Sequence, residues 1–157
     1  MQKTMAGSGA PLPAAGEGKR GEAGYLAYLL RQANAANRLR LERALGTVGV
    51  TQPQFVVLTM LGAYPGLSNA DVARLSLLTP QTVSVIMANL DKMGAIVRQP
   101  HPEHGRIQTI ALTEHGRRLL ADCREHAQAL EAHLRAGLNE EEEKIVRRWL
   151  TGLAKEA

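Results

Sequence analysis

The sequence predicts a mainly α-helical protein that carries one small β-ribbon. Apolar residues recur at helical spacing over most of the chain from residue 24 onward. The stretch Thr79–Leu112 departs from this pattern, because a helical segment there ends at Gly94 and two short β-like segments follow. Another short helix lies before this stretch, and a turn of only a few residues joins it to Thr79. Helices joined so closely are typical of a helix-turn-helix. Together these features predict a winged helix-turn-helix, in which the ribbon is the wing.

Length and composition narrow the classes of protein that fit. The 157 residues suit one domain, and 45% of them are hydrophobic, which is enough for a core. Only 3% are aromatic, which argues against a single-strand or RNA binder built on exposed rings. The net charge of +4 and the pI near 9.6 give mild support for a polyanionic partner.

Cysteine usage and hydropathy predict the compartment. The single cysteine excludes an internal disulfide framework and fits a reducing cytosol. No apolar run approaches the roughly 20 residues of a membrane span. No hydrophobic segment separates Lys3 from Lys19, so the N-terminus is not a signal peptide. We therefore expect a cytoplasmic protein without membrane contact.

The first part of the chain predicts a tail and two helices. Residues 1–21 are rich in Gly, Ala and Pro and lack a period, so we expect a disordered tail ahead of a domain at 22–157. A helix is expected over 24–45, with these apolar markers: Leu26, Leu29, Leu30, Ala33, Leu41 and Leu45. Thr51 opens the next helix with Gln54 as its capping-box partner, and the run that follows is apolar nearly all round, so it should be buried.

Two short helices come next. Ser68 starts the first, with Asp71 in the capping-box position. Its residues expected to face the core are Val72, Ala73 and Leu75. Thr79 caps the second helix, and Pro80 fits its first position. Its apolar face is formed by Val83, Ile86, Met87 and Leu90. The residues that lie off that face are Gln81, Thr82, Ser84 and Asn89.

The ribbon and the last two helices complete the chain. Gly94 ends the preceding helix in the left-handed conformation, and strands over 95–99 and 107–112 flank a tip at 100–106. Thr113 caps a long helix that runs to about Ala136, and Asn139 caps the last one. The apolar stripes of the terminal helices exceed what the small winged unit can cover. We therefore expect helices 24–45 and 113–155 to pack against a second copy of the chain.

Five segments follow one another along the chain: LSNADVAR, TPQTVS, LDKMGAIVR, HGR and LTEHG. In this order and spacing they resemble the multiple-antibiotic-resistance regulator (MarR) family of bacterial transcription factors. The similarity runs from about Tyr25 to Leu153. The resemblance implies a homodimer of winged-helix subunits, joined through the terminal helices, that binds a palindromic operator and usually represses. One segment departs from the family, because Pro100–His104 replaces an Asp-rich wing tip. The acidic partner of the wing arginine is then Glu103 or is absent.

The resemblance also implies which residues bind DNA. The helix-turn-helix would be Asn69–Leu90, within a DNA-reading unit at about 51–112, with Arg106 as the minor-groove arginine of the wing. Neutral donors and acceptors suit base edges, a hydroxyl at a helix start suits a phosphate, and an arginine suits a narrow A·T-rich minor groove. The predicted DNA-binding residues are Ser68, Asn69, Thr79, Gln81, Thr82, Ser84, Asn89, Arg98, His104 and Arg106.

A small aromatic or carboxylate effector is the partner expected besides double-stranded DNA. The residues that could bind it are Tyr28, Arg31 and Phe55, although core packing explains Tyr28 and Phe55 equally well. Cys123 lies on an apolar stripe and is interpreted as a buried, inert thiol rather than a redox sensor. His126 and His133 are about 10 Å apart along one helix, too far to share a metal ion.

Other functions remain open at this point. A winged-helix domain that binds a ligand or a protein without DNA is the first alternative, and a thiol- or metal-responsive regulator is another. No nucleophile–base pair, Gly-rich phosphate loop or metal-binding motif occurs, so we expect neither an enzyme nor a cofactor.

Overall fold

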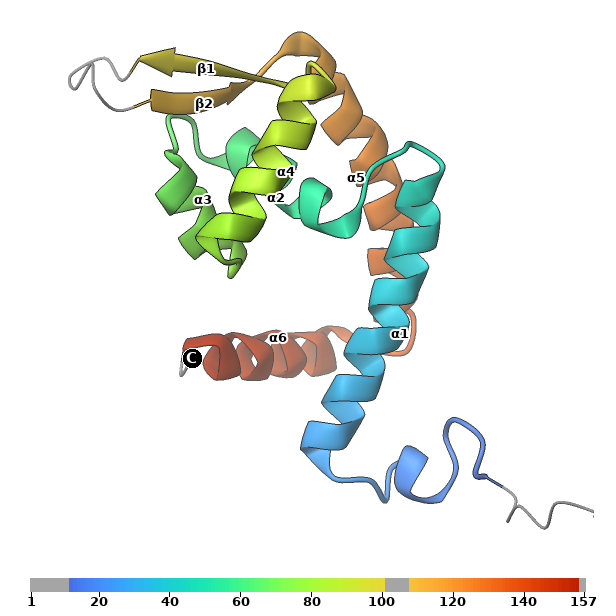
Figure 1. Cartoon of the computed structure of the whole chain (residues 1–157). Helices are drawn as coiled ribbons and strands as arrows, with labels where there is room; N and C mark the ends of the chain where they lie inside the picture. Colours follow the sequence, from blue (N-terminus) through green and yellow to red (C-terminus); the bar gives the residue numbers. More distant parts are fainter. Residues whose placement is uncertain (1–11, 101–107, 156–157) are drawn as a thin grey trace, which may run out of the picture. The chain divides into compact units, whose positions relative to one another are not determined.

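The computed structural model describes residues 12–100 and 108–155, and it has the predicted architecture: mainly α with a small β-ribbon (Figure 1). The elements are η1 (Gly18–Arg20), α1 (Leu26–Gly46), α2 (Gln52–Ala63), α3 (Asn69–Ser76), α4 (Pro80–Lys92), β1 (Ile96–Pro100), β2 (Gln108–Leu112), α5 (Glu114–Arg135) and α6 (Glu140–Lys155). The chain divides into two compact units, Met1–Leu39 and Arg40–Ala157. Among the described residues, no helix is both long and apolar enough to cross a membrane.

The first unit holds η1 and most of α1. The Arg20 guanidinium donates to the Pro13 carbonyl at 2.7 Å, and the Lys19 ammonium lies 5.4 Å from the centre of the Tyr25 ring. Tyr25 and Leu26 are 78% and 69% exposed. The boundary predicted at residue 21 stays a prediction.

The second unit has a single core that is shared by the end of α1, by α2 to α5 and by the ribbon. The largest fully buried side chains are Leu45, Val57, Leu58, Val72, Val83, Met87, Leu90, Ile110 and Cys123. The prediction for Leu75 was wrong, because that side chain is 45% exposed. Leu75 lies about 110° around the α3 axis from the midpoint between Val72 and Ala73, which are the buried residues of that helix.

The helices begin at the predicted caps. Gln54 N–H donates to Thr51 Oγ1 at 3.4 Å, and Thr51 N–H donates to Gln54 Oε1 at 2.8 Å. Ser68 and Asp71 form the same reciprocal pair at α3. Thr79 and Thr113 accept from backbone N–H groups at the starts of α4 and α5, and Asn139 does so at α6. Because capping is local chemistry, sequence alone was sufficient to place these starts.

The turn between α3 and α4 contains an unexpected conformation. Leu77 has φ 53°, in the left-handed region, and its side chain is 84% exposed. Leu78 N–H donates to the Ala73 carbonyl at 3.1 Å, which closes the end of α3. A non-glycine residue in this conformation costs roughly 1 kcal/mol, so the turn is held by the packing of the two helices around it.

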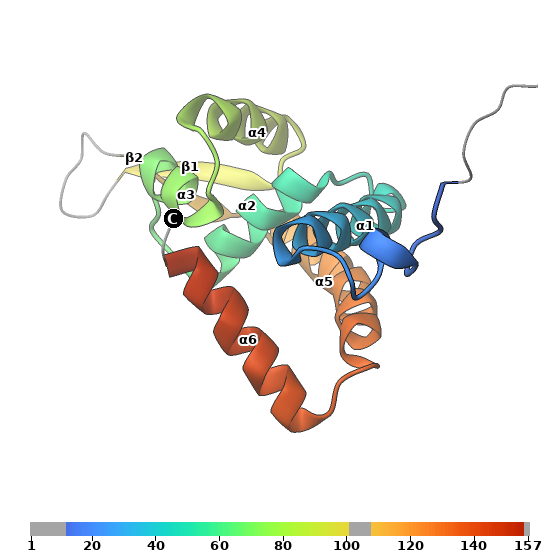
Figure 2. The same ribbon diagram turned by 90° about the horizontal axis from the view of Figure 1, so that it is seen from below.

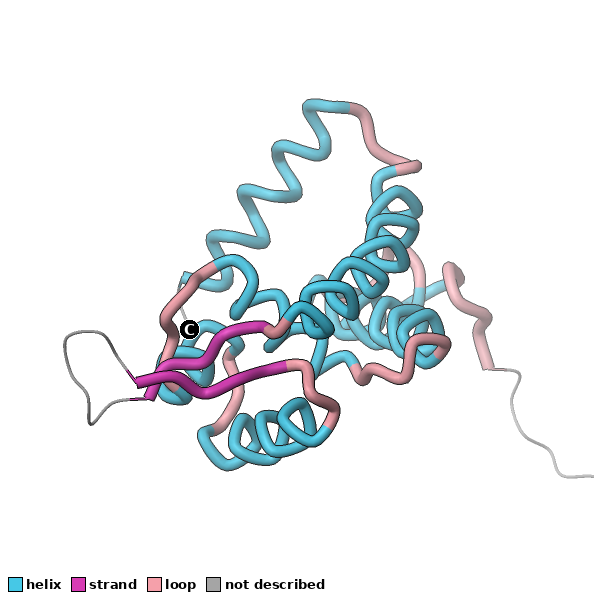
Figure 3. Tube along the Cα trace, turned by 90° about the horizontal axis from the view of Figure 1, so that it is seen from above, coloured by secondary structure: helices cyan, strands magenta, loops and turns pink. Residues whose placement is uncertain are grey.

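The strands form one antiparallel pair, in which Ile96 is opposite Leu112 and Arg98 is opposite Ile110 (Figure 3). β1 begins one residue later than predicted. Gly94 has φ 67°, as expected for a glycine that ends a helix. Ile110 N–H also donates to the Leu67 carbonyl at 3.0 Å, which ties the ribbon to the start of α3.

The base of the ribbon is fixed to α5 by a close backbone contact. Thr113 N–H donates to the Ala95 carbonyl at 3.0 Å, and Thr113 Oγ1 donates to the Gly94 carbonyl at 2.7 Å. A Cβ at Gly116 would lie 1.9 Å from the Ala95 oxygen. This approach explains the glycine inside a helix, because any side chain there would push α5 away from β1.

Helix α6 follows α5 after a short turn and has no buried residue (Figure 2). Arg147 pairs with Glu131 of α5 and with Glu143, and Arg135 also pairs with Glu143. Arg147, and then Arg135, hold the pKa of the Glu143 carboxyl below its usual value. The exposed apolar residues of α6 are Ile145, Trp149, Leu150 and Leu153.

Replacing Gly116 with Ala should destabilise the second unit by about 2–3 kcal/mol, because the added methyl group meets backbone that cannot move aside cheaply. Gly46→Ala is the matched control, since it makes the same change in a helix where nothing lies within 4 Å. The control should be neutral or stabilising by up to about 1 kcal/mol. Urea unfolding of the two variants measures this, and equal midpoints would contradict the proposed contact.

The start of α3 should make stability depend on acid pH. Hydrogen bonds from the Ser68 hydroxyl and backbone N–H, and then from Arg74, lower the pKa of Asp71 from 3.8 to about 2. Because the folded-state pKa is depressed, this stabilisation is complete above about pH 5 and is lost as pH falls toward 2. The difference in melting temperature between the wild type and Asp71→Asn should therefore shrink over that range. A difference that stays constant would show that the carboxylate contributes nothing to the cap.

Candidate nucleic-acid interface

Helix α4 has two faces of different character. Val83, Ile86, Met87 and Leu90 are buried, so the prediction of one apolar face is confirmed. At about 100° per residue, Gln81 and Lys92 point almost directly away from those four, and Val85 and Ala88 lie about 30° from that direction. All four of these outward residues are exposed. The helix is therefore anchored on one side and free to meet a partner on the other.

Thr82, Ser84 and Asn89 flank that outward line, and all three are exposed. The Thr79 and Thr82 hydroxyl oxygens are 2.8 Å apart and share a hydrogen bond. The Ser84 hydroxyl donates to the Pro80 carbonyl at 2.9 Å, so its proton is used within the helix. In the part of the chain that the structure describes, no side-chain hydrogen bond engages Gln81 or Asn89. These two amides are therefore the polar groups best placed for base edges.

Sequence reasoning missed the outward residues Val85 and Ala88. Apolar periodicity defined the buried face, and only the polar residues off that face were considered for DNA contact. Val85 is 62% exposed although it is branched and apolar. Counting 100° per residue from the buried face would have found both residues.

The start of α3 is already engaged in its own cap. The Ser68 hydroxyl donates to Asp71 Oδ2 at 2.6 Å, and Ser68 N–H donates to the same oxygen at 3.0 Å. The Asn69 side-chain oxygen is buried and accepts no hydrogen bond within the described residues. The predicted DNA-binding roles of Ser68 and Asn69 stay predictions.

The wing is described only at its base. Arg98 is exposed on β1, and the strands continue to the pair Pro100 and Gln108. His104 and Arg106 lie outside the described residues, so the predicted minor-groove contact stays a prediction.

The three residues predicted to bind an effector belong to different units of the chain. Tyr28 and Arg31 are exposed in the first unit, whereas Phe55 of the second unit is partly buried against the core. Their common role in a ligand site stays a prediction.

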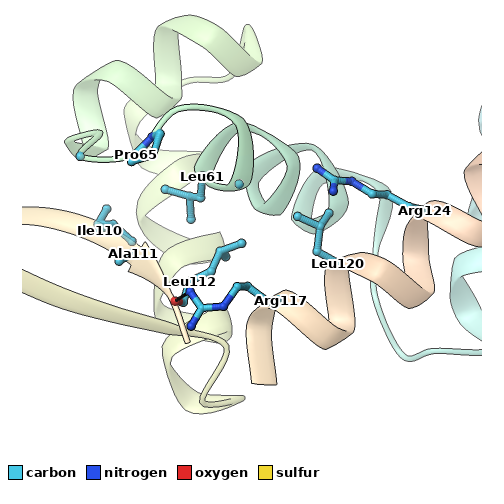
Figure 4. Close-up of a pocket in the computed structure, with 10 residues that line it drawn as sticks. Leu61, Pro65, Ile110, Ala111, Leu112, Arg117, Leu120 and Arg124 are labelled. Atoms are coloured by element: carbon cyan, nitrogen blue, oxygen red, sulfur yellow. Dashed lines mark hydrogen bonds between the residues drawn. The ribbon is translucent and has the colours of Figure 1, made fainter. Parts of the chain in front are cut away.

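Within the second unit, a cavity of about 380 Å³ lies between the end of α2, strand β2 and the first half of α5. Its apolar lining includes Leu61, Pro65, Ile110, Leu112 and Leu120, and its polar groups include Arg117 and Arg124 (Figure 4). Arg117 donates to the Leu112 carbonyl at 3.0 Å. Arg124 makes no ion pair with another described residue. An apolar floor with two guanidinium groups suits a small organic anion.

Cys123 is fully buried, as predicted. Burial, and then the neighbouring Asp122, raise the pKa of its thiol, which therefore stays protonated near neutral pH. Within residues 12–100 and 108–155, no group of three His, Cys, Asp or Glu side chains could hold a metal ion.

Comparison with known proteins agrees with this geometry. The sequence pattern of the MarR family matches residues 48–107, which include α2, the helix-turn-helix and strand β1 and end just before β2. The HTH-type transcriptional repressor Rv2887 of Mycobacterium tuberculosis is 34% identical over 128 residues, which cover 82% of this chain and 92% of the relative.

Solved structures support the same assignment. The crystal structure of Rv2887 in complex with DNA has a TM-score of 0.67 at 32% identity, and the match covers 82% of this chain and 97% of that one. The Rv2887 complex with p-aminosalicylic acid has a TM-score of 0.66 at 32% identity over 83% and 98% of the two chains. The Staphylococcus aureus MepR–DNA complex reaches 0.77 at 26% identity over 85% and 98%. With a relative above 30% identity over most of both chains, this chain belongs to the MarR family of helix-turn-helix transcriptional regulators.

Proposed function

We propose that the protein is a sequence-specific DNA-binding repressor that acts as a homodimer and is released from its operator by a small ligand. The observation that carries the proposal is the division of α4 into a buried apolar face and an exposed face that is uncharged until Asp91 and Lys92 in the last turn. A helix anchored in this way can enter a major groove without rearranging its core. The relatives Rv2887 and MepR, both crystallised with DNA, support the same use here.

Exposed apolar side chains on the terminal helices support dimerisation. In the second unit, Trp149 is 41% exposed and Ile145 is 54% exposed on α6. In the first unit, Leu26 is 69% exposed and Leu39 is 53% exposed on α1. Apolar surface repeated along whole helices is typical of a subunit interface. In a twofold dimer, the two α4 helices would meet half-sites about 10 base pairs apart.

Release would follow from a ligand that binds the DNA-incompetent arrangement of the dimer more tightly than the competent one. Rv2887 was crystallised with p-aminosalicylic acid, which is an aromatic carboxylate. The cavity beside Arg117 and Arg124 suits this chemical class. It also adjoins the joint between ribbon and α5, because Arg117 holds the Leu112 carbonyl next to the Thr113 cap. A carboxylate that competes for Arg117 would weaken its hydrogen bond to the Leu112 carbonyl, where the ribbon meets α5.

The alternative from another class is a winged-helix domain that binds a ligand without DNA. Under that alternative, changes on the outer face of α4 would leave function intact. An enzymatic role has no support from the described residues. The family assignment supports action on bacterial DNA, and hence a place in the cytoplasm.

Gln81→Ala should weaken binding to the promoter beside the protein's own gene by about tenfold or more, since an amide bidentate to adenine discriminates by 1–3 kcal/mol. Ser84→Ala is the matched control on the same helix, because the Ser84 hydroxyl already donates to Pro80, and it should change binding less than about threefold. Fluorescence anisotropy at fixed moderate salt measures both. Equal effects of the two substitutions, or no specific binding by a folded wild-type dimer, would count against the proposal.

Arg124→Gln should weaken binding of p-aminosalicylic acid about tenfold or more, because it removes a charged donor from the cavity. Arg31→Gln makes the same change at the site first predicted from sequence and should have little effect. Thermal shift and ligand-induced loss of DNA binding measure both variants. If Arg31→Gln abolishes the response and Arg124→Gln keeps it, the effector binds at the first-predicted site instead.

A further inference from the structure

The outward line of α4 is apolar at its middle. Val85 is 62% exposed, and Ala88, one turn further along the same line, is also exposed. Single exposed apolar residues are common on protein surfaces. The setting of this pair is less common, because no charged residue occurs between Thr79 and Leu90. The exposed face of a solvated helix is usually charged, so this face suits a partner surface that carries apolar groups.

The major groove offers one such group. The C5-methyl of thymine is the apolar contact point among the base edges there, and it packs against small or branched aliphatic side chains. Polar side chains that suit base edges lie on either side of Val85, with Gln81 one turn before it and Asn89 one turn after it. Their amides suit adenine, which presents an acceptor and a donor in the same groove. The face as a whole is therefore chemically complementary to A·T pairs.

We propose that Val85, supported by Ala88, determines specificity by packing on thymine C5-methyl groups in each operator half-site. The inference rests on the proposed function, because it assigns a further role on the helix that would enter the major groove. The neighbouring hydroxyls strengthen it. Ser84 donates to the Pro80 carbonyl, so its proton is not available to fix a base beside Val85, and Thr82 shares a hydrogen bond with Thr79.

Removing the methyl group from the DNA tests the proposal without altering the protein. The probe is the duplex that the wild-type protein enriches from a random-sequence library. Each thymine of the duplex is replaced in turn by deoxyuridine, which keeps base pairing and loses only the C5-methyl. At one or more symmetry-related thymines, uracil should weaken binding about fourfold per half-site and about 15-fold when both half-sites are changed, as expected for one buried apolar carbon.

The matched protein change is Val85→Ala. Because both subunits carry it, it should weaken binding to the thymine duplex about as much as uracil in both half-sites does, and uracil should then cause no further loss. Val85→Thr keeps one methyl and should retain part of the sensitivity. Alanine favours an exposed helix more than valine does, so weaker binding would not reflect unfolding, and melting curves check this. Equal binding to every uracil duplex by the wild type, or a uracil effect that persists in Val85→Ala, would overturn the inference while leaving DNA binding intact. Failure to enrich any sequence would instead contradict the proposed function.

Discussion

The burial of Val83, Ile86, Met87 and Leu90 beneath α4 is the contact on which the rest of the molecule depends. These side chains fix the rotation of the helix about its own axis. That rotation decides which residues face outward, and it places Gln81 and Val85 on the outermost line. A helix of ordinary surface character would carry charges there. Up to its last turn, where Lys92 lies on the same line, this one carries amides and aliphatic groups, which suit base edges better than phosphates.

A second constraint links α4 to the remainder of the second unit. Gly94 ends the helix with φ 67°, and the next residue, Ala95, lies against Gly116 of α5. Thr113 bonds to both Gly94 and Ala95, so helix end, ribbon and α5 meet at one point. The cavity lined by Arg117 lies beside that point. The residues that end the DNA-reading helix and those that suit an organic anion are therefore linked by hydrogen bonds through Leu112 and Thr113, which gives a ligand a direct route to that helix.

Local chemistry was predictable from sequence, and packing was less so. The caps at Thr51, Ser68 and Thr79 and the stop at Gly94 each depend on a few neighbouring residues, and the sequence placed all four. Leu75 was placed in the core because it is leucine, yet its angle around α3 exposes it. The left-handed conformation at Leu77 could not be predicted, because no glycine occupies that position. Gly116 is required by its contact with Ala95, which is distant in the sequence. Within the candidate site, the polar residues predicted on α4 are exposed, and Val85 was overlooked because apolar residues were expected inside.

The central claim is that two copies of α4 present their outward faces to one duplex. Because Cys123 is fully buried, a cysteine introduced in place of exposed Lys92, to which no base contact is assigned, can carry an iron chelate that cleaves nearby DNA. The account predicts cleavage at two places, symmetric about the operator centre and about 10 base pairs apart. The unsubstituted protein should take up no label and cleave nothing. Cleavage at a single place, or none from a labelled protein that still binds the operator, would contradict the account.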